Sequence, residues 1–82
     1  MKMIKLNRVK FVYVVLAHVA SIRIFDQEGK YAIEYTLSGG GYSEEKFDSF
    51  DSVDVEMFKS RLYALREFFD FNELGREYED KL

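Results

Sequence analysis

Residues 21–37 read SIRIFDQEGKYAIEYTL, two alternating runs of apolar and polar side chains joined by Asp-Gln-Glu-Gly. Such alternation is typical of β-strands that bury one face, and a glycine such as Gly29 readily adopts the left-handed conformation that tight turns need. We therefore expect a β-hairpin with Asp26–Gly29 as a four-residue loop, since a three-residue loop would mix Ile33 with Arg23. The expected facing pairs are Ile24 with Tyr31, Ile22 with Ile33, and Ala20 with Tyr35.

An amphipathic helix is expected from Val53 to Phe71. Its apolar residues recur every three or four positions, at Val55, Phe58, Leu62, Leu65 and Phe69. Asp51 or Ser52 can cap the free amides at its start, and Asn72 and Gly75 are stop signals near its end. We expect the apolar stripe to cover the sheet face that carries Ile22, Ile24, Tyr31, Ile33, Tyr35 and Leu37.

Between hairpin and helix, Ser38–Gly41 contains three consecutive glycines and predicts a break in the chain. The residues that follow are acidic, which is the wrong charge for a phosphate-binding loop. Tyr42–Phe50 then has the pattern of a short polar edge strand, with Phe47 and Phe50 as its two apolar anchors.

Residues 3–20 are ambiguous, since both a strand and a helix fit their apolar pattern. Their β-branched content favours a strand, and the absence of turn residues between Arg8 and Asp26 favours one long or bulged strand, bent near Ala17–Ala20. The expected fold class is α+β, an antiparallel three- to four-stranded sheet packed on one long C-terminal amphipathic helix, in the order β-β-β-α.

The chain has 82 residues, which suits one domain over 1–82, with 76–82 as a charged tail that can fray. It has no cysteine, so we expect a reducing, cytoplasmic location. The apolar run Phe11–Ala20 is half the length of a membrane span, and a secretory leader is disfavoured because the run is β-branched and contains His18.

Charge is divided along the chain. Residues 1–24 carry five basic and no acidic side chains, whereas residues 25–82 carry seven basic and fifteen acidic ones. The two halves could neutralise each other across the sheet. Alternatively, an acidic ridge would repel nucleic acid and attract a basic protein surface. The acids of that ridge are Glu44, Glu45, Asp48, Asp51, Asp54 and Glu56.

No pattern of catalytic or metal-binding residues emerges. His18 is the only histidine and has no carboxylate, serine or cysteine at a suitable spacing, so a structural role is expected. Asp48, Asp51 and Asp54 are spaced like calcium ligands but lack the internal glycine and terminal glutamate of a calcium loop. We expect no enzyme activity, no metal and no cofactor.

The apolar residues of the N-terminal third exceed what one helix can cover. Unless an N-terminal helix or the C-terminal tail covers the second face of the sheet, that face must meet another copy of the chain or a different protein. Tyr13, Phe25 and Tyr42 are candidates for an exposed aromatic patch. The expected partner-binding residues are Tyr13, Phe25, Tyr42, Glu44, Glu45, Asp48 and Asp51.

Several short motifs occur in an order that resembles a known family. They are Ala17-His18, the strand Ile22–Phe25, the turn Glu28-Gly29-Lys30, a second strand, and Phe47-Asp48-Ser49 before an acidic-capped helix. This order, over residues 10 to 65, resembles the small phage-encoded anti-CRISPR proteins, in particular type I-F inhibitors of similar length. The resemblance implies a protein that binds the backbone subunits of a CRISPR surveillance complex and blocks access of target DNA by contact alone. No binding residue is transferred from that family.

The function expected from the sequence is therefore a non-catalytic protein-binding module, an inhibitor from a phage or mobile element. Its expected partner is a protein with a basic surface, and a CRISPR effector complex is one candidate. Direct binding of nucleic acid or of a membrane is not expected. The alternative is a small structural homodimer or adaptor, with the strand from Arg8 to Ala20 pairing with its own copy.

Overall fold

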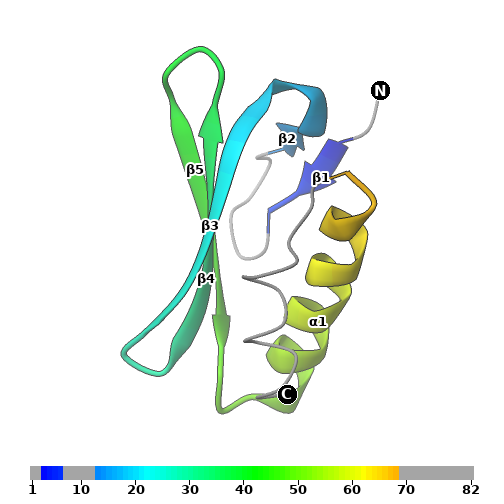
Figure 1. Ribbon diagram of the computed structural model, residues 1–82. Helices are drawn as coiled ribbons and strands as arrows, with labels where there is room; N and C mark the ends of the chain where they lie inside the picture. Colours follow the sequence, from blue (N-terminus) through cyan, green and yellow to red (C-terminus); the bar gives the residue numbers. More distant parts are fainter. Residues whose placement is uncertain (1–2, 7–12, 69–82) are drawn as a thin grey trace.

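The computed structural model describes residues 3–6 and 13–68. Its elements are β1 (Met3–Lys5), β2 (Tyr13–Val15), a 3₁₀ turn (Leu16–His18), β3 (Val19–Gln27), β4 (Lys30–Leu37), β5 (Tyr42–Asp48) and α1 (Ser52–Arg66). The three long strands form one antiparallel sheet in the order β3-β4-β5, and β1 and β2 form a separate small hairpin. Figure 1 shows α1 and the β1–β2 hairpin on the same side of this sheet. The expected α+β fold class is confirmed.

The β3–β4 hairpin forms, but its register differs from the expected one by two residues. Gln27 pairs with Lys30, so the loop contains only Glu28 and Gly29. Ile24 lies opposite Ile33 and Ile22 opposite Tyr35, while Ala20 falls in a register irregularity between Val19 and Ser21. The expected four-residue loop is wrong because Glu28 and Gly29 both adopt positive φ, at 52° and 77°, which is how a two-residue type I′ turn closes a hairpin.

A shift of two residues keeps every side chain on its expected face, since side chains alternate with a period of two. Ile24, Ile33 and Tyr35 are buried in the core, and Ile22, Tyr31 and Leu37 pack against it. This is the sheet face that the helix was expected to cover, and that expectation is confirmed.

The helix α1 begins at the expected place. Asp51 is its N-cap, and its side chain accepts a hydrogen bond from the amide of Val53. Phe58, Leu62 and Leu65 are buried, as the stripe predicted. The helix extends to Arg66, with Glu67 and Phe68 in a turn, and the other expected positions, Phe69–Phe71, Asn72, Gly75 and 76–82, lie outside the described residues.

Three aromatic rings join α1 to the sheet. Tyr31 and Phe47 lie opposite each other on β4 and β5, and Phe58 packs over both. The ring of Phe58 stacks on Tyr31 at 4.7 Å between centroids and is tilted against Phe47 at 5.4 Å. Phe47 is thus the apolar anchor expected for β5, whereas Phe50 is 88% exposed and is not an anchor.

The N-terminal third does not form one long strand. Tyr13–Val15 pairs with Met3–Lys5, and the 3₁₀ turn Leu16–His18 separates β2 from β3. The bend lies close to the expected place, but the expected continuous strand is wrong because the chain folds back over the sheet. The buried side chains that it adds to the core are Ile4, Leu6, Val14, Leu16 and Val19.

The second face of the sheet is not the apolar surface that was expected. Alternation from the paired residues places Arg23, Glu34 and Glu44 side by side on it, and the next row contains Phe25, Ala32 and Lys46. Ion pairs of 3.5 Å join Arg23 to Glu34 and Lys46 to Glu44. The excess apolar residues are instead buried by the β1–β2 hairpin on the helix side. Within the described residues, no helix is long and apolar enough to cross a membrane.

The turn offers a test of the register. Glu28 stands where a type I′ turn favours asparagine, aspartate or glycine, since an ordinary side chain is strained at positive φ. We expect Glu28→Asp, which keeps the charge, to raise the free energy of unfolding by about 0.5 kcal/mol. Glu28→Val, with a β-branched side chain, should lower it. Urea denaturation of wild type, Glu28→Asp and Glu28→Val checks this order of stability. Equal unfolding midpoints would contradict the two-residue turn.

Candidate functional site

The six acids of the expected ridge do not form one exposed surface. Glu45 is 1% and Asp54 is 2% exposed, so neither carboxylate can meet a partner in the folded chain. The ridge as expected is therefore wrong for these two residues, because strand alternation turns Glu45 inward and helix packing buries Asp54. Glu44 is half-buried on the outer face of β5 and Glu56 is exposed on α1.

Three of these acids organise the connection between β5 and α1. Asp48 accepts a hydrogen bond from the amide of Phe50 at 2.9 Å, and Asp51 caps the helix through the amide of Val53 at 2.9 Å. Asp54 accepts from the amide of Asp48 at 2.8 Å. The regular Asp48, Asp51, Asp54 spacing thus serves a turn and a helix start, since short carboxylates bind nearby backbone amides.

The three aromatic candidates lie on different parts of the molecule. Tyr42 is exposed at the start of β5, and Tyr13 is exposed on β2 in the separate hairpin. Phe25 is half-buried, with the Arg23 guanidinium 4.5 Å from the centre of its ring. Alternation places Phe25 and Tyr42 on the outer sheet face, whereas Tyr13 belongs to another sheet, so the three do not form one patch.

A buried polar network lies between the sheet and the helix. Glu45 Oε1 on β5 accepts hydrogen bonds from the Tyr35 hydroxyl at 2.6 Å and from Arg61 Nε at 2.8 Å. The same Arg61 donates from Nη2 to the carbonyl of Lys5 at 2.7 Å. A buried carboxylate is costly unless it is paired and hydrogen-bonded, and here both conditions are met. The network ties β4, β5, α1 and β1 together.

Burial raises the pKa of Tyr35 far above its ordinary value, and the negative charge of neighbouring Glu45 raises it further. The phenol therefore remains protonated and serves as a permanent hydrogen-bond donor to Glu45.

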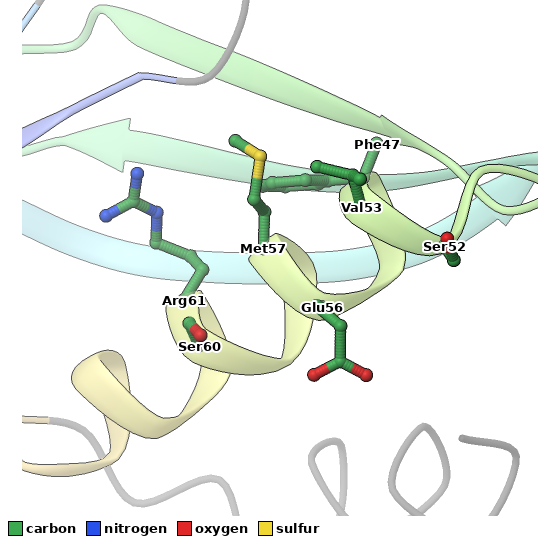
Figure 2. A pocket seen from close by; sticks show the side chains of 7 residues that line it. All are labelled: Phe47, Ser52, Val53, Glu56, Met57, Ser60 and Arg61. Atoms are coloured by element: carbon green, nitrogen blue, oxygen red, sulfur yellow. The ribbon is translucent and has the colours of Figure 1, made fainter.

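An open groove runs along α1 next to the network, with a volume of about 580 Å³. Figure 2 shows Val53, Met57 and Arg61 in a row along one side of the helix, with Phe47 behind them. Val53 and Met57 are 64% and 41% exposed, although both are apolar. Ser52, Glu56 and Ser60 complete the lining. The groove thus combines exposed apolar side chains with one acidic side chain, Glu56, and one basic side chain, Arg61.

The sequence patterns singled out neither Arg61 nor the exposed pair Val53 and Met57. One signal was present, because these three residues recur every four positions and so share one side of a helix. The pairing of Arg61 with Glu45 could not be derived, since it depends on where α1 docks against β5.

His18 is exposed at the end of the 3₁₀ turn, where its carbonyl accepts hydrogen bonds from the amide and hydroxyl of Ser38. No group of three or more histidine, cysteine, aspartate or glutamate side chains suited to a metal is found in residues 3–6 and 13–68. No protein-family model matches the chain, and neither a curated protein nor a solved structure is significantly similar to it.

The buried ion pair can be tested against an exposed one on the same helix. We expect Arg61→Met to lower the free energy of unfolding by about 3 kcal/mol, because it leaves the Glu45 carboxylate buried without its cation. The control is Lys59→Met, which removes the exposed ion pair with Glu56. It should change the free energy of unfolding by less than about 0.5 kcal/mol. Equal losses in urea denaturation would contradict the network.

The raised pKa of Tyr35 predicts a loss of stability at alkaline pH. Above pH 10 the unfolded chain releases the phenol proton while the folded chain retains it, so the free energy of unfolding falls as pH rises. One such group contributes a slope of about 1.4 kcal/mol per pH unit, and below pH 10 it contributes none. Tyr35→Phe, though less stable at neutral pH, should show a correspondingly shallower decline. Parallel stability curves from pH 9 to 11 would contradict this prediction.

Proposed function

We propose that this protein is a non-catalytic binding module whose partner is a protein with a basic surface. The observation that carries the proposal is the groove along α1, where the exposed apolar side chains of Val53 and Met57 lie next to the exposed side chain of Glu56. Of the six acids in residues 44–61, Glu45 and Asp54 are buried and Glu44 lies on the outer face of the sheet, so Glu56 is the acid that lines this groove. Apolar contacts supply affinity in such a surface, and the net charge of −3 that the chain carries favours a basic partner.

Catalysis has less support than binding. The two buried carboxylates among the described residues already accept hydrogen bonds, Glu45 from Arg61 and Tyr35, and Asp54 from the amide of Asp48. Carboxylates held by such bonds contribute to stability and are poorly placed to transfer protons.

The resemblance to anti-CRISPR proteins makes a CRISPR surveillance complex the first partner to test. Inhibition by contact alone needs only a bound protein that keeps DNA away. An acidic module bound to the basic DNA-binding surface of the complex would do so. A structural homodimer or adaptor remains the alternative proposal. Sedimentation of the protein at high micromolar concentration tests the homodimer, since a monomer at that concentration would reject it.

The experiment uses the tagged protein to capture a stoichiometric partner from the lysate of a bacterium with a type I-F CRISPR system. We expect the tagged protein to capture a basic protein or complex, and this capture should weaken as the salt concentration rises. The variant Glu56→Lys should lose this capture, since Glu56 lines the groove and lies outside the buried network. The control Glu67→Lys changes an exposed acid beyond the end of α1 and should retain it.

Two outcomes would reject the proposal. One is the absence of any stoichiometric partner in lysates of the candidate hosts. The other is a partner that all three proteins capture equally at every salt concentration, because a basic surface must respond to charge reversal.

A further inference from the structure

We draw no further inference here: the strongest candidate, the apolar slot between Val53 and Met57 in the groove along α1, belongs to the site already described, and nothing in the structure shows what covers it.

Discussion

The Glu45 carboxylate is the constraint on which the remainder of this structure depends. It is buried at the middle of an edge strand, where its charge must be compensated by a cation and by hydrogen bonds. Arg61 supplies the cation and Tyr35 the second donor. Since Arg61 also binds the carbonyl of Lys5, one carboxylate fixes the rotation of α1 and the position of the β1–β2 hairpin.

The same pairing determines what α1 leaves exposed. With Arg61 directed at β5 and Phe58, Leu62 and Leu65 in the core, the side of the helix that carries Val53 and Met57 borders the sheet without being buried by it. The groove is thus a consequence of how the helix docks. The contact between Arg61 and Glu45 holds α1 in this position, so the stability of the fold and the shape of the groove are linked through Arg61.

The sequence predicted the elements with local causes and missed those that depend on contacts distant in the chain. The helix start follows from Asp51 and the core stripe from residue spacing, and both are confirmed. The hairpin register was wrong because Glu28, an unusual residue at positive φ, forms the turn with Gly29. The β1–β2 hairpin was missed because no turn residue marks it, and its pairing requires residues on both sides of the 7–12 segment.

The candidate site was predicted only in part, for the same reason. Composition correctly marked residues 44–56 as acid-rich, but it could not distinguish carboxylates that cap a helix from those that face solvent. The apolar surplus of the N-terminal third likewise has an internal use, as the β1–β2 hairpin packs into the core. Of the apolar side chains that remain exposed, Val53 and Met57 line the groove along α1.

A double-mutant cycle between Glu45 and Arg61 tests the central role of the buried carboxylate most directly. The free energy of unfolding is measured for wild type, Glu45→Gln, Arg61→Met and the double variant. We expect a coupling energy of about 2 kcal/mol, because each single variant leaves the other partner buried without its counterpart. Additive losses, with coupling below about 0.5 kcal/mol, would show that the two residues act independently and would contradict this account.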